Sequence, residues 1–569
     1  MPLFPHARFL SLALAAACLA GCSAARYRQQ ADRDVYSLLA QKELKLFGHT
    51  NAFTVDTSYS ARDPFAVKAE EIIQDRFRSG KAFVTLPEAL RLVVTNNRAY
   101  QLRKETLYLT GLTLTLDRHA FEKRPLGTLG GTVARDATDA VHATENASLS
   151  VAQLLQSGGT LSATLANDMV RYFTGDPSRS VTTVMSLNFT QPLLRGFGAD
   201  VVAETLRQSE RDVVYDLRGY ALFQQTFAVD TVITYFRLLQ RKDAVRNGYD
   251  NYLKLRKGRE QSEALNQGER LSAYQVDQAR QEELKAQIAY ISAVELYQSG
   301  LDAFKQTLGL PVGFGLALDD GALKELEATG LIPVALTEEA GYEAAVARRM
   351  DLLNEIDRFE DAKRKITVTV NRLKPNLTFV ASTSLGSDAV NYAKFDLRQY
   401  KASAGLQLDL PFDRLSERNL YRAALIGFER ELRLLAIALD TARESVRQGL
   451  RSLTTVRQNY LIQQNALELA NRRVDSANML LTAGRAQVRD QLEAQTAQVQ
   501  AQNAVTQALV DYHSARLRLL IDVGVLPATG DKFWLRPMGL PGAPATTNAV
   551  PVAGKILEVQ PPEKIFSQP

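Results

Sequence analysis

The stretch LRLLAIALDTARESVRQGLRSLTTVRQNYLIQQNALELANRRVDSANMLL, residues 432–481, carries the strongest periodic signal in this chain of 569 residues. An apolar residue recurs at every seventh position, and no proline interrupts the run. The repeating residues are Leu432, Leu439, Val446, Leu453, Tyr460, Leu467, Val474 and Leu481. An unbroken seven-residue repeat imposes a left-handed supercoil on packed helices. A helix from about residue 417 to residue 481 would be roughly 95 Å long, which suits a coiled-coil tube better than a globular domain.

The helix that is predicted to return from this one has a different composition. Residues 491–504 are rich in glutamine and alanine and contain few large apolar side chains. A helix of this kind can pack by its alanines and present its amides to water. Composition alone leaves two interpretations open, namely the wall of an aqueous tunnel and an ordinary solvated face of a coiled coil.

The same succession of predicted elements occurs twice along the chain. The first half opens at Thr85, where Thr85 and Glu88 form a candidate capping box with Pro87 in the first turn, and its opening helix extends to about residue 118. The second half opens at Thr337, and its opening helix extends to about residue 373. Each half is expected to contain an opening helix, two strands and a long helical hairpin. We therefore predict repeats at residues 84–311 and 337–527, joined by a linker at residues 312–336.

Alternating segments between the helices predict the strands. In residues 184–190, Met185, Leu187 and Phe189 alternate with polar side chains, and residues 377–382 and 402–410 repeat the pattern. Residues 147–170 also alternate, with a kink expected at Gly158-Gly159, whereas the glycine-rich residues 127–132 follow a helix and are interpreted as a linker. Alternation gives a strand one apolar and one polar face. The apolar face meets a core in a soluble sandwich and lipid in an outer-membrane barrel, and the pattern alone does not separate the two.

Prolines mark where the strands are expected to end. Pro192 follows one alternating segment, Pro375 precedes another, and Pro411 follows the last. Because proline cannot donate a hydrogen bond to a sheet ladder, we predict strand–helix junctions at these three residues.

The N-terminus resembles a bacterial lipoprotein signal. Arg8 precedes an apolar run at residues 9–20, which is too short to span a bilayer, and the run leads into Leu19-Ala20-Gly21-Cys22. The resemblance implies a signal peptide at residues 1–21, lipidation of Cys22, and sorting to the outer membrane because Ser23 follows the cysteine. Residues 22–83 are predicted to form a polar, lipid-anchored arm with short helical patches, and residues 528–569 a proline-rich tail.

Composition and motifs argue against several classes of function. The net charge of +5 is small for this length, and no basic run interleaved with aromatic residues indicates nucleic-acid binding. The five histidines are scattered without metal-ligand spacing. There is no phosphate-binding loop, dinucleotide fingerprint or nucleophile elbow. We therefore expect no enzyme, no cofactor and no site that transduces energy, so that transport would be driven by a partner protein.

With the lipoprotein signal, duplication, strands and heptads, the sequence resembles the TolC-like outer-membrane efflux factors over roughly residues 84–527. The motifs that carry the resemblance are residues 191–198, QPLLRGFG, residues 308–311, LGLP, and residues 348–352, RRMDL. The resemblance implies a mainly helical homotrimer in which each protomer gives four strands to a shared twelve-stranded transmembrane barrel. Long helical hairpins would then form a periplasmic tunnel. The side chains expected to face lipid are Met185, Leu187, Phe189, Leu406 and Leu408.

The resemblance also assigns the tips of the helical hairpins. In the second half, Asp490 and Glu493 match a pair of acids that narrows the periplasmic aperture, and spacing of three places both on one helical face. The first-half tip looks one residue longer than the second. Docking of a periplasmic adaptor protein is expected at Gly268, Glu269, Arg270, Leu271, Ser272, Gly484, Arg485, Ala486 and Gln487.

The leading hypothesis is therefore a passive, gated outer-membrane channel of a tripartite efflux or type I secretion system. Its partners would be a periplasmic adaptor and an inner-membrane pump of the RND or ABC type, and the pump would select the substrate. The alternative is a periplasmic coiled-coil adaptor or a structural lipoprotein without a pore. Adaptors usually have a single hairpin, whereas this chain has two hairpins and strands in each half.

Overall fold

A computed structural model describes residues 23–135, 140–174, 179–387, 394–526 and 532–536. The chain divides into two compact units. The first consists of Met1–Val55, Glu105–Arg218 and Asn354–Ala436. The second consists of Asp56–Lys104, Gly219–Leu353 and Ile437–Pro569. The expected signal peptide, the lipidation site Cys22 and residues 537–569 of the expected tail lie outside the described residues.

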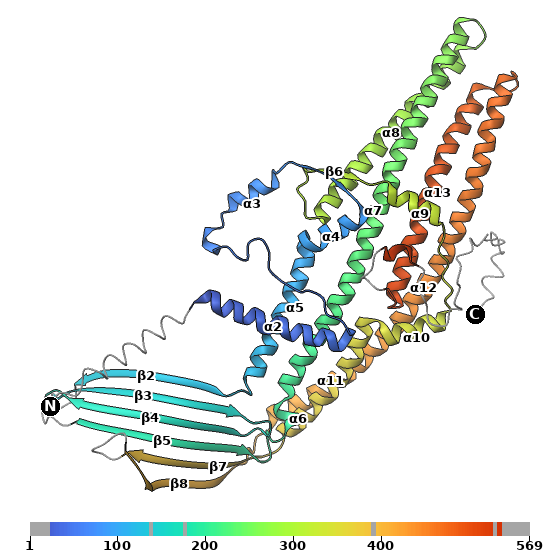
Figure 1. The fold of residues 1–569 in the computed structure, drawn as a ribbon. Helices are drawn as coiled ribbons and strands as arrows, with labels where there is room; N and C mark the ends of the chain where they lie inside the picture. Colours follow the sequence, from blue (N-terminus) through green and yellow to red (C-terminus); the bar gives the residue numbers. More distant parts are fainter. Residues whose placement is uncertain (1–22, 136–139, 175–178, 388–393, 527–531, 537–569) are drawn as a thin grey trace. The chain divides into compact units, whose positions relative to one another are not determined.

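The first unit contains one sheet of six strands, in the order β2-β3-β4-β5-β7-β8 (Figure 1). The strands are β2 Arg124–Arg135, β3 Val141–Leu154, β4 Thr160–Tyr172, β5 Arg179–Pro192, β7 Asn376–Ser387 and β8 Phe395–Asp409. Every neighbouring pair is antiparallel. The prediction of two strands in each half is therefore wrong for the first half, which contributes four strands to the sheet, whereas the second half contributes the two expected.

Glycines explain why the two additional strands were missed. Gly158, with a φ of +92°, lies in the turn between β3 and β4, where its amide donates to the carbonyl of Leu155 at 2.9 Å. A Cβ atom there would collide with the carbonyl oxygen of Gly196, so the turn requires glycine. The expected kink at Gly158-Gly159 is a hairpin turn instead. The expected linker at residues 127–132 lies inside β2, where each residue pairs with one of β3.

A helix of the first unit occupies much of the region that was expected to be a polar arm. Helix α2, Ala24–Phe47, buries Val35, Leu38 and Leu39. It packs against α5, Arg98–His119, where the hydroxyl of Tyr108 donates to Asp32 Oδ1 at 2.7 Å. The first part of the expected arm is therefore one continuous helix, in which a narrow apolar stripe is flanked by polar residues. The short helix α6, Ala199–Val202, follows β5.

Two helical hairpins dominate the second unit (Figure 1). The first pairs α7, Glu204–Gln267, with α8, Ala273–Thr307, and the second pairs α12, Leu415–Thr482, with α13, Val488–Asp522. Both α7 and α12 begin in the first unit and continue into the second. With 68 residues, α12 is about 100 Å long. Within the second unit, its seven-residue repeat buries Val446, Leu453 and Tyr460.

Each half opens with two helices where one was predicted. These are α4, Leu86–Asn96, and α5 in the first half, and α10, Glu338–Arg348, and α11, Met350–Arg372, in the second. The first break occurs at Asn97, whose side-chain oxygen accepts a hydrogen bond from the amide of Tyr100 at 3.0 Å. The capping box of Thr85 and Glu88 is confirmed at the start of α4. The halves therefore repeat the same order of two helices, antiparallel strands and a helical hairpin.

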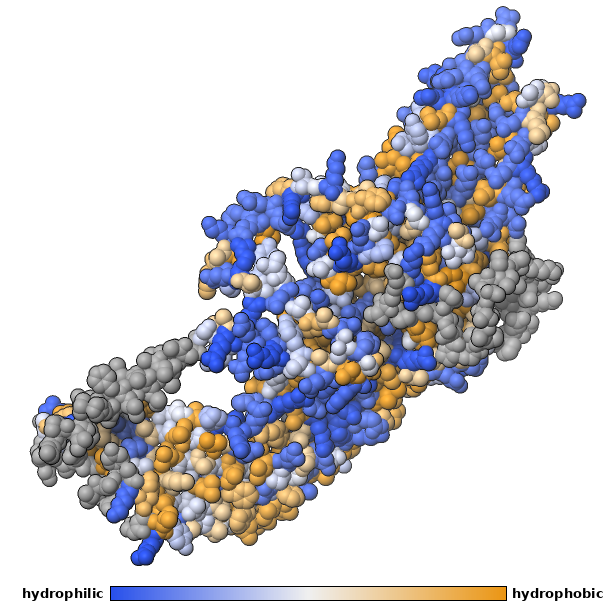
Figure 2. All heavy atoms as spheres, viewed as in Figure 1, coloured by the Kyte–Doolittle hydropathy of each residue, from blue (hydrophilic) through white to orange (hydrophobic). Residues whose placement is uncertain are grey.

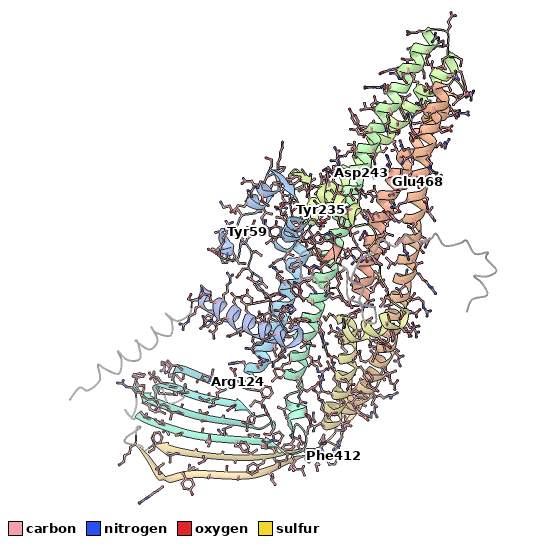
Figure 3. The ribbon with its side chains drawn as sticks, turned by 45° about the vertical axis from the view of Figure 1, so that its right-hand side comes forward. Tyr59, Arg124, Tyr235, Asp243, Phe412 and Glu468 are labelled. Carbon is pink, nitrogen blue, oxygen red and sulfur yellow. The ribbon has the colours of Figure 1, made fainter. Side chains whose placement is uncertain are left out.

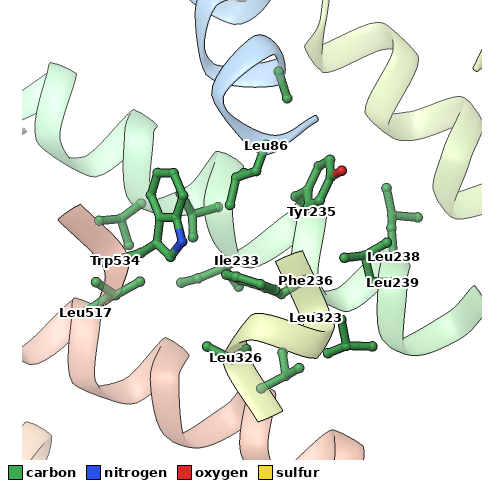
Figure 4. Packing of buried hydrophobic residues seen from close by; sticks show 14 of the residues in the cluster. Leu86, Ile233, Tyr235, Phe236, Leu238, Leu239, Leu323, Leu326, Leu517 and Trp534 are labelled. Carbon is green, nitrogen blue, oxygen red and sulfur yellow. The ribbon is translucent and has the colours of Figure 1, made fainter. Parts of the chain in front are cut away.

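A small mixed core lies beside the hairpins of the second unit (Figure 4). Strand β1, Lys81–Val84, pairs in parallel with β6, Gly315–Leu318, and α9, Gly321–Thr329, follows β6. The buried hydroxyl of Tyr235 donates to the carbonyl of Val84 at 2.9 Å, and Trp534 from the short helix η2, Phe533–Leu535, enters the same core. The region predicted as a linker, residues 312–336, thus contains β6 and α9. The remaining elements of the unit are η1, Pro64–Ala66, and α3, Ala69–Arg76.

No helix among the described residues has an 18-residue stretch that is apolar enough to cross a membrane.

Candidate functional site

The sheet of the first unit has one apolar face. Met185 on β5 lies opposite Leu165 on β4 and Leu385 on β7, and Leu165 lies opposite Leu149 on β3. Directly opposed residues of antiparallel strands project from the same face of the sheet. The register therefore aligns apolar side chains in rows across neighbouring strands. Leu187, Phe189, Leu406 and Leu408 belong to the same face, as the alternation in the sequence predicts.

The opposite face of the sheet is polar. Ser186 lies opposite Thr164 and Ser384, and Thr164 lies opposite Ser150. Hydroxyl groups form hydrogen bonds between strands on this face, as at the 2.7 Å contact between Ser382 Oγ and Ser403 Oγ. A face of small hydroxyl side chains is well suited to contact with water, because each group can donate and accept hydrogen bonds.

The apolar face is exposed in the described part of the chain. The side chains of Leu406 and Met185 are 67% and 55% exposed, and Leu129 on β2 is 86% exposed. Figure 2 shows hydrophobic residues gathered over the strands. A contiguous exposed apolar face of this kind marks a surface that contacts lipid or another protein.

The strands join the helices through tightly bonded junctions. Pro192 is the last residue of β5, Pro375 directly precedes β7, and Pro411 follows the end of β8 by two residues. Beside them, Asn371 Oδ1 accepts a hydrogen bond from the amide of Gly196 at 2.7 Å. The guanidinium of Arg414 donates to the carbonyl of Leu373 at 2.6 Å. These bonds fix the ends of the strands to α11 and to the start of α12.

A buried carboxylate, which the sequence did not reveal, links α7 to α11 in the first unit. Asp361 is 2% exposed, accepts a hydrogen bond from the hydroxyl of Tyr215 at 2.5 Å, and lies 2.6 Å from Arg364 Nη1 and 2.9 Å from Arg211 Nη1. Burial, together with the hydrogen bond to Asp361, raises the pKa of Tyr215. Two cations therefore compensate one buried anion, as burial of a charge requires. Among the described residues, no group of three or more His, Cys, Asp or Glu side chains could hold a metal ion.

The second hairpin tip places both predicted aperture acids at the start of α13. Asp490 Oδ2 accepts a hydrogen bond from the amide of Gln487 at 3.2 Å and thereby helps to cap the helix. Glu493 lies 3.6 Å from Arg473 Nη2 and 3.7 Å from Arg489 Nε. The side chains of Asp490 and Glu493 are 44% and 53% exposed. These two arginines, which the spacing of the acids does not predict, balance the charge of the acids within one protomer.

The two tips have the same length, so the prediction of a longer first tip is wrong. After α12, Gly484 has a φ of +68°, and the amide of Arg485 donates to the carbonyl of Leu480 at 2.8 Å. After α7, Glu269 has a φ of +57°, and the amide of Arg270 donates to the carbonyl of Leu265 at 2.9 Å. Both are helix ends with one left-handed residue. In the first tip the left-handed residue is Glu269, although a glycine, Gly268, directly precedes it.

This alignment identifies the first-half counterparts of the aperture acids. The N-cap residues are Ser272 and Gln487, so that Gln275 corresponds to Asp490 and Gln278 to Glu493. Only the second tip therefore carries the acidic pair. The hairpins pack together behind their tips through a buried cluster of Leu255, Ala279, Ala286, Val488 and Leu492.

The glutamine- and alanine-rich part of α13 packs by large apolar residues as well as by alanine. Leu492, Ala494 and Val499 are buried, whereas amides at other positions bond to amides of neighbouring helices. Gln498 Nε2 donates to Asn471 Oδ1 on α12 at 2.8 Å. Asn247 on α7 donates to Asn503 Oδ1, also at 2.8 Å. The amides thus hold the two hairpins of one chain together, in addition to any contact with water.

No protein-family model matches this chain, and no curated protein sequence matches it. Solved structures do match. CusC, described as forming a transmembrane channel, has 11% identity and a TM-score of 0.56, with 79% of this chain and 94% of that chain covered. The CmeC outer membrane channel of Campylobacter jejuni has 16% identity and a TM-score of 0.56, over 77% of this chain and 85% of that chain.

The MtrE outer membrane channel of Neisseria gonorrhoeae, in its open state, matches with 11% identity and a TM-score of 0.55, over 77% of this chain and 88% of that chain. At such low identities the likeness is one of fold. The chain has the fold of the TolC-like outer-membrane efflux channels, as the resemblance in its sequence predicts.

Proposed function

We propose that this chain forms a passive outer-membrane conduit for efflux or type I secretion. The observation that carries the proposal is the two-faced sheet, apolar on one side and rich in hydroxyl groups on the other. Its strands contain 12 to 15 residues, and about 9 to 11 residues suffice for a tilted strand to cross a bilayer. The fold that the chain shares with outer membrane channels supports the same conclusion.

The conduit is proposed to be a homotrimer. Within the described residues, β2 pairs only with β3, and β8 pairs only with β7, so that each copy has two open edges. Open edges cannot exist in the hydrocarbon of a bilayer, because their backbone groups would lack hydrogen-bond partners. Three copies that join edge to edge would close the sheet into a barrel with the apolar face toward lipid. The long hairpins of the three copies would then enclose a periplasmic tunnel.

The acidic pair on the second tip is proposed to set the periplasmic aperture. Three copies would bring six carboxylates, from Asp490 and Glu493, to the entrance, and rings of carboxylates favour cations. Arg473 and Arg489 lie beside Glu493 at 3.6 and 3.7 Å, which gives the ring a built-in counter-charge. We infer that the ion pairs between these arginines and the two acids rearrange when the aperture opens.

The partners are proposed from the resemblance of the sequence to the TolC-like family. A periplasmic adaptor would dock on the tips, at residues 268–272 and 484–487, and an inner-membrane pump of the RND or ABC type would provide the energy. Lipidation of Cys22 is proposed to direct the protein to the outer membrane and to aid assembly, because a barrel would already anchor it.

The proposal is tested by extracting the full-length protein from outer membranes with detergent, measuring the mass of the assembly, and measuring solute entry into vesicles that contain it. A trimer that dissociates on heating and makes the vesicles permeable to small solutes is expected. A monomer that dissolves without detergent and leaves vesicles sealed would instead indicate a coiled-coil adaptor or structural lipoprotein.

A further inference from the structure

The β2–β3 hairpin continues the sheet and most of its two-faced pattern, with Glu145 of β3 on the apolar face and Leu126 of β2 on the polar face as exceptions. Leu149 on β3 lies opposite Leu165 on β4, and Val133 and Leu129 of β2 project from the same apolar face. On the polar face, Thr128 Oγ1 lies 2.6 Å from Ser148 Oγ. The hairpin is therefore an integral part of the sheet, because most side chains of β2 and β3 match the apolar and polar faces of the other four strands.

Both edges of the enlarged sheet are suited to backbone pairing. Every residue of β2 is exposed, and residues 126–134 of β2 and 402–408 of β8 contain no charged side chain. Proteins that keep a sheet edge unpaired usually protect it with lysine, proline or a short strand. Here these stretches of β2 and β8 carry none of these protections, although Lys401 lies near the middle of β8. Their lack of protection indicates that another strand covers them.

The directions of the two edge strands are compatible with closure. Figure 3 shows Arg124, at the start of β2, and Phe412, just beyond the end of β8, at the same end of the sheet. The two strands therefore run in opposite directions. When β8 of one copy meets β2 of the next, they form an antiparallel pair like the five others. A head-to-tail contact of this kind generates a closed ring when the rotation between successive copies closes.

We propose that three copies of this chain close a wall of eighteen strands, through pairing of β8 in one copy with β2 in the next. The number rests on the proposed homotrimer and on the six strands that each copy contributes. It departs from the twelve strands that the sequence resemblance implied. The partner that covers each open edge is thus a second copy of this chain.

Strand number determines the width of the pore. With strands about 4.8 Å apart and tilted by about 40°, twelve strands give a backbone diameter of about 24 Å, and eighteen strands about 36 Å. Barrels of sixteen to eighteen strands leave an aqueous channel. The outer part of this conduit would therefore be wide and lined with hydroxyl groups, so that selection of solutes falls to the hairpin tips.

Disulfide cross-linking tests which strands meet between copies. Leu129→Cys on β2 is combined, one at a time, with Tyr400→Cys, Ala402→Cys and Ala404→Cys on β8. Within one copy, β2 and β8 are separated by five strand spacings, or roughly 24 Å, so a disulfide can form only between copies. We expect cross-linked trimers from at least one pair, and no cross-link from the single-cysteine variants.

The matched control moves the first cysteine to β4, as Leu165→Cys, with the same three positions on β8. If the β2–β3 hairpin leaves the wall, β4 becomes the edge and these pairs should cross-link. Cross-linking through β4, or trimers that show no cross-link through β2, would overturn the proposal while leaving a trimeric channel intact.

Removal of the hairpin gives an independent measurement. Deletion of residues 124–154, with a short glycine–serine linker, joins the end of α5 to the turn before β4 at the same end of the sheet and leaves four strands. In planar bilayers, polyethylene glycols added on the side of the outer loops should enter the full-length pore up to a diameter larger by about 12 Å than in the deletion variant. Equal size limits in two trimeric pores would contradict an eighteen-stranded wall. Absence of trimers and pores from the full-length protein would refute the proposed function itself, and the strand number with it.

Discussion

Met185→Arg tests most sharply whether the apolar face of the sheet contacts lipid. Met185 lies in the middle of β5, six residues after Arg179 and seven before Pro192. It is 55% exposed, and its neighbours Leu165 and Leu385 are apolar. The matched control is Ser186→Arg, one residue further along the same strand, on the face that is proposed to contact water.

The expected cost follows from the position in the strand. Six to seven residues, each advancing about 2.5 Å along the membrane normal when the strand is tilted, place Met185 roughly 15 to 18 Å from either end of the strand. This depth is near the middle of the bilayer, where arginine on the lipid face costs about 2 to 4 kcal/mol. Such a cost corresponds to a decrease of about 30-fold to 1,000-fold in the folding equilibrium. Ser186→Arg should change the free energy of folding by less than about 1 kcal/mol, because its charge remains hydrated.

The assay is folding of the full-length protein into lipid vesicles at a series of urea concentrations, followed by the heat-sensitive mobility of the trimer. A second readout is labelling of Met185→Cys and Ser186→Cys with a water-soluble maleimide in the assembled protein. We expect Ser186→Cys to react and Met185→Cys to be protected. Equal cost for the two arginine variants, or the reverse order of labelling, would refute the assignment of the faces.

Three further predictions concern the helical parts. Asp490→Asn combined with Glu493→Gln keeps the helix cap but removes the charge, so the preference of the pore for cations over anions should fall severalfold in bilayer recordings; an unchanged ratio would exclude these acids from the aperture. Glu269→Gly should raise the free energy of unfolding by about 1 kcal/mol, and Gly484→Ala should lower it by a similar amount, because both residues have a positive φ. If chemical denaturation shows that Glu269→Gly lowers the free energy of unfolding, or that Gly484→Ala raises it, the tip conformations are contradicted. Burial holds the pKa of His513 at about 4, below its ordinary 6.5, so the unfolded chain binds more protons between these values. The contribution of neutral His513 to the free energy of unfolding is complete above pH 6.5, and about 3 kcal/mol of it is lost as the pH falls to 4. In His513→Gln, the free energy of unfolding should no longer show this dependence on pH.

The sequence predicted the long helices and the polarity of the strands because both depend on local periodicity. The seven-residue repeat around Val446 and Tyr460 buries one stripe of α12, and alternation around Met185 gives β5 two faces. Neither outcome requires knowledge of distant contacts. The long helices and the two faces of the strands were therefore accessible from the order and period of apolar residues alone.

The number of strands was not accessible in this way. Glycine lacks a side chain, so Gly127, Gly130 and Gly131 leave positions on both faces of β2 without a side chain and obscure its alternation, and the turn at Gly158 resembles a kink. Residues 124–135 form a strand because they pair with β3, and such pairing between segments is not visible in the periodicity of one segment.

The candidate aperture was predicted in part for a related reason. Spacing places Asp490 and Glu493 on one face of α13, and the sequence was sufficient for that. Arg473 approaches Glu493 from α12, twenty positions away in the chain, and this neighbour appears only when the hairpin is folded. The turning role of Glu269 was also hidden, because a left-handed conformation at a glutamate has no sequence signature of its own.

Single-channel recording of the purified full-length assembly in planar lipid bilayers tests the central claim most directly. If three copies of the two-faced sheet form a pore through the membrane, insertion should give discrete, long-lived current steps, and these steps should disappear when heat dissociates the trimer. An assembly of confirmed mass that associates with the bilayer and never conducts would contradict the account.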